Sequence, residues 1–238
     1  MFNLTIARIT ARALFGRRRF LMLLPLPALL IGLAALSQSL GAEPKDWGPA
    51  VILGLGIAVV LPVIALVVGT GVLGSEIDDG TLAHILAKPL PRRDIILSKL
   101  VVAVLVTFVT TAVPLAITGF IADMPRLAWG LTVAAAVGSL AYCCLFAALS
   151  LLTRRPVLLG LVYVLVWEGL LTNLIQGTRV LSIQQYVVTV ADRIAPTALL
   201  NADVSLPVSL GMTFVFSVGA TLLAIDRLRS FSVVGETS

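Results

Sequence analysis

The side chains that could do chemistry in this 238-residue chain are few, and most of them stand apart from one another. The single histidine, His84, has no cysteine or second histidine close to it, so we interpret it as a helix-surface residue rather than a metal ligand. Cys143 and Cys144 are adjacent within an apolar run, which favours packing over a disulfide or a metal site. No metal site is therefore expected.

Motifs for catalysis within the membrane are also missing from the sequence. A protease or lipid-processing site needs a nucleophile and a base, or metal ligands, gathered at one depth. The sequence has no H-E-x-x-H, no G-x-S-x-G and no paired carboxylates within its apolar runs. It also has no G-x-x-x-x-G-K-[ST], the loop that cradles nucleotide phosphates. We expect that the chain is not an enzyme, has no catalytic residues and holds no cofactor of its own.

Much of the remaining charge gathers in one internal segment. Residues 74–99 contain four of the 12 acidic residues, four basic residues and the histidine. Acidic residues near Ser75 suit a helix N-terminus, and Thr81 can cap a second short helix. Prolines 89 and 91 then stop that helix. The pattern predicts a short helix with an apolar face and a basic end, of the kind that fits a groove on a cytoplasmic partner.

Composition places the chain in a membrane. Apolar residues make up 59% and charged residues 12% of the sequence, and the mean hydropathy is +1.07. Several apolar runs reach the roughly 20 residues that a helix needs to cross a bilayer. The net charge of +5 does not indicate nucleic-acid binding, because basic residues of membrane proteins collect in cytoplasmic loops. We predict one all-α polytopic membrane domain over residues 1–238.

Six transmembrane helices are predicted from the apolar runs, with prolines at several of the breaks. If the N-terminus lies inside, thirteen of the 17 lysines and arginines fall in cytoplasmic segments, as the positive-inside rule requires. Both termini and the charged loop, residues 74–98, are therefore predicted to be cytoplasmic. The predicted spans are residues 20–40, 50–73, 99–122, 127–152, 157–175 and 206–225.

Two further helices are expected to lie along the membrane surface. Residues 1–18 place Phe2, Ile6 and Ile9 on one face and arginines off it, which is typical of an interfacial helix near anionic lipid headgroups. A solvated tail is the alternative. Residues 180–195 repeat apolar residues at helical spacing and predict a helix at the outer surface. That helix either caps a translocation path or closes a loop.

Glu168 is the only acid well inside a predicted span. By helical rise it lies about 16 Å from the inner end of the span. An ionisable group at such depth is costly and faces a cavity or a partner. Glu168 is thus a candidate for the lining of a translocation path, together with Asn173. Alternatively it is a structural group, for instance one paired with Asn173 one turn further out.

The charged loop resembles the first cytoplasmic loop of ABC-2-type transporter permeases. Permeases of that family have six spans, an N-terminal interfacial helix and a surface element between the last two spans, and the predicted layout is similar over essentially the whole chain. Members often carry Ser-Arg after a Lys-Pro pair, where this chain has Leu90-Pro91 and then two arginines. The residues that carry the resemblance are Glu76, Gly80-Thr81-Leu82, Leu86, Lys88-Pro89, Arg92 or Arg93, and Lys99.

The resemblance implies that the loop holds a coupling helix between spans two and three, which docks on a separate ATP-binding subunit. Two permease copies, or this chain and a related permease, would enclose the path in the plasma membrane above two ATPases, which would bind ATP and Mg²⁺.

Export predominates in the family, and the lack of a charged channel lining in the predicted spans favours a hydrophobic or amphipathic cargo. An ATP-independent channel or a membrane scaffold would share the topology. The residues assigned to ATPase coupling are Glu76, Gly80, Thr81, Leu82, Ile85, Leu86, Lys88, Pro89, Arg92 and Arg93.

Overall fold

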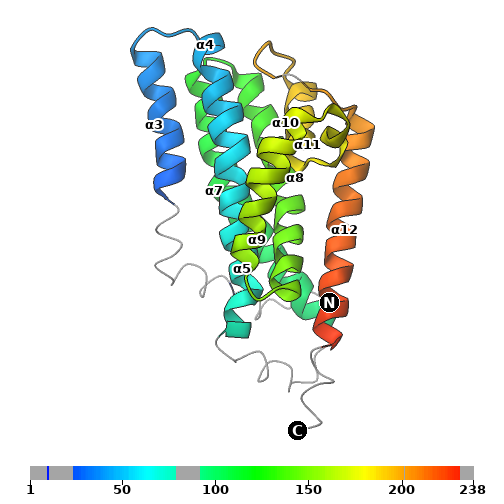
Figure 1. Cartoon of the computed structure of the whole chain (residues 1–238). Helices are drawn as coiled ribbons and strands as arrows, with labels where there is room; N and C mark the ends of the chain where they lie inside the picture. The colour runs from blue at the N-terminus through cyan, green and yellow to red at the C-terminus, as the bar shows by residue number, and fades with distance from the viewer. Residues whose placement is uncertain (1–9, 11–23, 79–91, 201, 231–238) are drawn as a thin grey trace.

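The computed structural model describes residues 10, 24–78, 92–200 and 202–230, and every regular element in these ranges is a helix. Figure 1 shows the long helices standing side by side. The prediction of an all-α chain is confirmed for this part of the sequence. The elements are α3 (Pro25–Ser39), α4 (Pro44–Gly48), η1 (Pro49–Val60), α5 (Leu61–Asp78), α7 (Arg92–Ile121), α8 (Pro125–Leu152), α9 (Pro156–Val162), η2 (Tyr163–Leu171), α10 (Thr172–Leu174), η3 (Gln176–Leu181), α11 (Ile183–Ile194) and α12 (Leu206–Ser230).

Within the described residues, four helices are long and apolar enough to cross a membrane, and they correspond to the second, third, fourth and sixth predicted spans. Helix α3 and the continuous apolar helix of α9 and η2 are shorter. The count of six spans therefore stays a prediction, and the predicted interfacial helix, residues 1–18, lies outside the described residues apart from Thr10. The four long helices cover Pro44–Val72, Arg93–Ile121, Pro125–Leu152 and Leu206–Leu228.

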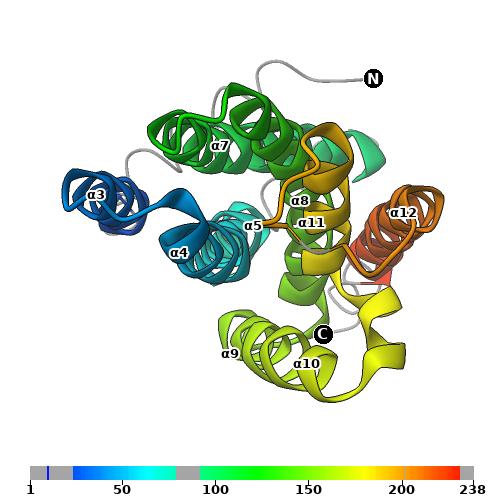
Figure 2. The same ribbon diagram turned by 90° about the horizontal axis from the view of Figure 1, so that it is seen from above.

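Helix α8 occupies the centre of the bundle. It packs against α5, α7, α9, α11 and α12, and Figure 2 shows these helices around it. Close approach is possible because small residues line α8. A Cβ atom added at Gly138 would lie 2.6 Å from Leu61 Cδ2, and one added at Gly119 of α7 would lie 2.6 Å from the Cα of Ala128. These glycines of α7 and α8 are thus packing residues.

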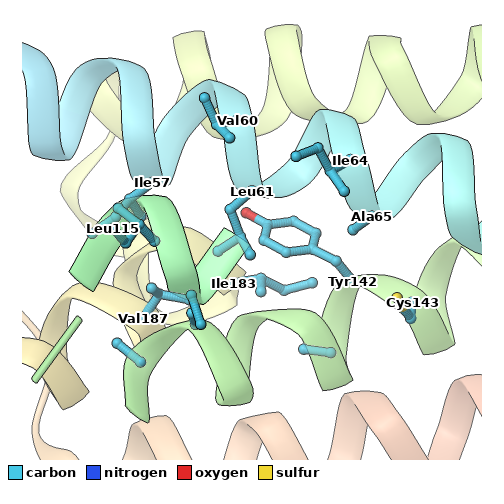
Figure 3. Close-up of a cluster of buried hydrophobic side chains, with 14 of the residues drawn as sticks. Ile57, Val60, Leu61, Ile64, Ala65, Leu115, Tyr142, Cys143, Ile183 and Val187 are labelled. Carbon is cyan, nitrogen blue, oxygen red and sulfur yellow. The ribbon is translucent and has the colours of Figure 1, made fainter. Parts of the chain in front are cut away.

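The core lies where α5, α8 and α11 meet. Figure 3 shows the Tyr142 ring among Leu61 and Ile64 of α5 and Ile183 of α11, and all four side chains are buried. The outward face of α7 is equally apolar but exposed, with Leu97, Val101, Leu105, Val109 and Val113 at every fourth position. A continuous apolar stripe of this kind on a bundle exterior suits contact with lipid.

Pro62 and Pro114 lie inside long helices, and neither ends its helix. Pro62 is the second residue of α5, which follows the π-helical segment η1. Pro114 lies within α7, and the Thr118 hydroxyl donates to its carbonyl oxygen at 2.8 Å. The turn after α7 is tight, and Asp123 adopts a left-handed φ of 57° there. Asp tolerates this conformation better than most residues with a Cβ atom.

Candidate functional site

Most of the residues assigned to ATPase coupling fall in the charged loop, and residues 79–91 lie outside the described part of the chain. This holds for the assigned residues from Gly80 to Pro89. Glu76 lies near the end of α5, and Arg92 begins α7, but their side chains are outside the described set as well. Arg93 is exposed, with its Nε atom 3.7 Å from Asp94 Oδ1. The coupling helix therefore stays a prediction.

The structure does show how the two helices that flank this loop are joined at its base. Lys99 of α7 is only 1% exposed. Its Nζ atom donates a hydrogen bond to the backbone carbonyl of Val72 in α5, at 3.1 Å. A buried ammonium group is costly unless it is hydrogen-bonded. Lys99 thus connects α5 to α7 close to the points where the loop leaves and re-enters the bundle.

A second polar group lies in the bundle interior, at Glu168 in the π-helical segment η2. The side chain is 2% exposed. Its Oε2 atom accepts a hydrogen bond from the Tyr142 hydroxyl of α8. Its Oε1 atom accepts from the backbone N–H of Gln184 in α11 at 3.2 Å and from the Tyr163 hydroxyl at 3.4 Å. One carboxylate therefore has hydrogen-bond donors from η2, α8 and α11.

The position of Gln184 explains why a carboxylate fits there. Gln184 is the second residue of α11, so its N–H group has no partner within the helix. The N-terminus of a helix also carries partial positive charge, which favours a nearby anion. Ser182 caps the same helix by accepting from the N–H of Gln185 at 3.4 Å. Glu168 and Ser182 thus both accept hydrogen bonds from backbone N–H groups at the start of α11.

Further contacts tie the segment around α11 to the rest of the bundle. We call residues 176–194, which form η3 and α11, the cap. Trp167 Nε1 donates to the carbonyl of Leu181 at 3.3 Å. Arg179 donates through Nε to the Thr172 carbonyl at 3.2 Å and pairs through Nη1 with Asp203 at 2.5 Å. The cap is therefore joined to α10, to η2 and to the segment before α12.

The sequence pointed to Glu168 but not to its partners. Asn173, the proposed neighbour, has a side chain outside the described set. The partners Tyr142 and Gln184 come from positions 26 residues before and 16 residues after Glu168. One signal was available in the sequence: a tyrosine within an apolar helix usually finds a hydrogen-bond partner for its hydroxyl.

This arrangement suits a role in holding helices together. Every contact that the structure gives the Glu168 side chain comes from a hydroxyl or a backbone N–H group. Among the described residues, no three His, Cys, Asp or Glu side chains are grouped so that they could bind a metal ion. A carboxylate with three donors fixes the relative positions of the elements that supply them.

A helical bundle with apolar helices of spanning length and an exposed apolar exterior defines a multi-pass membrane protein. The family model described as ABC-2 family transporter protein matches residues 17–185. That match covers more than half of the chain, which therefore belongs to the ABC-2 family of transporter proteins and is a permease of the ABC-2 type. The family that the sequence resembles is thereby confirmed. A search of curated proteins found no match.

Proposed function

We propose that the chain is the membrane-spanning subunit of an ATP-binding cassette exporter and is driven by separate ATPase subunits that bind ATP and Mg²⁺. The family match carries this proposal, because residues 17–185 include the whole charged loop, residues 74–98. In the proposed complex the chain has six spans and two cytoplasmic termini in the plasma membrane. A second copy or a related permease completes the path, with two ATPases beneath.

The base of the loop supports a role in coupling. A partner that moves the loop acts on the ends of α5 and α7, which the loop connects. Lys99 links these two helices through its bond to the Val72 carbonyl. A displacement of the loop is therefore passed to both helices together, as a rigid-body transition between two states of the bundle requires.

We further propose that the cargo is hydrophobic or amphipathic and that it passes between the two permeases. Among the charged side chains of the described residues, only Lys99 and Glu168 are buried, and both have hydrogen-bond partners. Glu168 and Asn173 are our candidates for residues beside the path. The donors around Glu168 favour a role in fixing the cap over direct contact with cargo.

Substitutions in the loop test this proposal. We expect Glu76→Ala and Leu86→Asp to abolish stimulation of the ATPase by the permease or assembly of the complex, because they remove the acidic start and the apolar face of the coupling helix. Insertion into the membrane should stay normal. Leu90→Asp is the matched control for Leu86→Asp within the same loop, since Leu90 is not among the residues assigned to coupling.

The measurement is ATPase activity and subunit composition of the purified complex for each variant. If Glu76→Ala and Leu86→Asp both couple like the unsubstituted chain, the loop is not the coupling element. An ATP-independent channel or a scaffold would show transport or anchoring that does not change when ATP is removed.

A further inference from the structure

We propose that Glu168 is a positioning residue that fastens the cap to η2, so that α11 leaves the bundle only when the η2 segment moves. The fastening itself is argued from contacts within this chain. Its part in transport, as a gate at the outer end of the path, rests on the proposed function.

Helix α11 is set deeply into the bundle. Ile183, Tyr186 and Val187 are each 0% exposed. A Cβ atom at Gly138 would lie 2.8 Å from Val187 Cγ2, and one at Gly130 would lie 2.9 Å from the Ala191 carbonyl oxygen. Helix α11 thus contacts the central helix α8 at both Gly130 and Gly138. Figure 2 shows α11 crossing over α8 near the middle of the bundle.

Glycines of α8 stand where it touches α11, so the two helices approach each other closely. Side chains interlock when ridges of one helix enter grooves of another. At Gly130 and Gly138 α8 has no side chain, and Ala191 and Val187 of α11 lie against these positions. Polar contacts of the cap add to this packing in fixing the position of α11.

Among these contacts, the hydrogen bond from the Gln184 N–H group to Glu168 is the buried one. The pair of Arg179 and Asp203 is partly exposed, with 27% and 46% of the two side chains accessible, and exposed ion pairs contribute little to stability. Glu168 is 2% exposed and accepts from Gln184 N–H at the first turn of α11. Hydrogen bonds are stronger in such a low-dielectric interior. Loss of the Glu168 hydrogen bond should therefore weaken the attachment of the cap to the bundle more than loss of the ion pair of Arg179 and Asp203.

The backbone around Glu168 suits a segment that changes shape. Residues Tyr163–Leu171 are π-helical, a geometry that is often found at functional sites and seldom in long stretches. The Thr172 hydroxyl donates to the Glu168 carbonyl oxygen within this segment. A change from π to α geometry would rotate the carboxylate relative to α8 and withdraw it from Gln184. Movement of the fifth predicted span would thus be linked to release of the cap.

Hydrogen–deuterium exchange of the full chain in lipid nanodiscs tests the fastening. We expect Glu168→Leu to speed exchange of amides 183–194 by about tenfold or more, because it leaves the Tyr142 hydroxyl and the Gln184 N–H without an acceptor. Glu168→Gln keeps the shape and should have a smaller effect in the same direction. Glu43→Gln is the matched control, since that acid is exposed and pairs with Lys45.

Tyr142→Phe tests the same fastening of α11 if Glu168→Leu does not fold, because it removes only the hydroxyl that donates to Glu168. Its effect on exchange of amides 183–194 should be non-additive with that of Glu168→Gln. Amides of α7, residues 92–121, report whether the bundle itself is intact. Unchanged exchange of α11 in Glu168→Gln and in Tyr142→Phe would overturn the inference.

The part in transport has a separate readout. In the complex with its ATPase, Glu168→Gln should leave assembly and ATP hydrolysis intact while transport per ATP falls. If the unsubstituted chain never assembles with an ATPase, the proposed function fails while the exchange result on α11 stands. If exchange rises but transport per ATP is unchanged, the cap is fastened by Glu168 but is not the gate, which overturns that part of the inference.

Discussion

At the scale of residues, two buried charges organise the polar interior of the described chain. Lys99 joins α5 to α7, and Glu168 joins η2, α8 and α11. The sequence marks Glu168, because an acid within an apolar run has a high desolvation cost. It does not reveal the partners, because hydropathy gives no register between helices that are distant in sequence. Lys99 belongs to the loop motif in the sequence, and its burial is shown by the structure alone.

Replacement of Lys99 tests its role at the base of the loop. Lys99→Met keeps the length of the side chain but removes the charge and the bond to Val72. We expect the bundle to lose about 1–3 kcal/mol of stability, as typical for a broken buried polar contact. Amides near residues 92–99 should exchange faster. Lys99→Arg, which can still donate, should recover part of the loss.

Lys45→Met serves as the control for Lys99→Met, because Lys45 is exposed and its pair with Glu43 lies on the surface. Stability is measured by thermal unfolding of the purified protein, and local opening by hydrogen exchange. If Lys99→Met unfolds and exchanges like Lys45→Met, Lys99 does not hold the two helices together.

At the scale of elements, sequence patterns locate most helices but not their full length or geometry. The predicted fourth span, residues 127–152, agrees closely with α8 at Pro125–Leu152, because a proline and a basic pair bound the apolar run. Helix α7 begins at Arg92, earlier than the predicted span at 99. The apolar run that predicts the span is interrupted by charged residues, whereas the helix itself includes those residues. The π-helical geometry of η2 has no signal in composition or periodicity, because it depends on tertiary contacts.

The close contact between α7 and α8 gives a prediction at this scale. A Cβ atom at Gly119 would lie 2.6 Å from Ala128 Cα and 2.7 Å from Ala128 N, which are backbone atoms that cannot move aside. Gly119→Ala should therefore destabilise the protein by about 1–3 kcal/mol, as overpacking does. Gly211→Ala in α12 is the matched control, because a Cβ atom there meets nothing within 4 Å.

The control should be neutral or slightly stabilising, since alanine has the higher helix propensity. Both variants are compared by thermal unfolding in the same lipid or detergent. Equal stability of Gly119→Ala and Gly211→Ala would mean that α7 and α8 do not meet as closely as the structure has them.

At the scale of the whole molecule, the chain is a multi-pass permease of the ABC-2 family. Its class follows from composition, and its family from the charge pattern of one loop together with the overall layout. Its partners, its cargo and the coupling helix are proposals that depend on residues 79–91 and on other chains. The sequence has no G-x-x-x-x-G-K-[ST] loop, which agrees with our proposal that separate ATPase subunits drive export.

Purification of the tagged full chain from its native membrane tests the central claim most directly. We predict that an ATP-binding subunit co-purifies at one copy per permease and that its ATPase activity is higher in the complex than alone. Leu86→Asp should remove the subunit or the stimulation. Recovery of the permease without any ATP-binding subunit, with transport by the chain alone in the absence of ATP, would contradict the account.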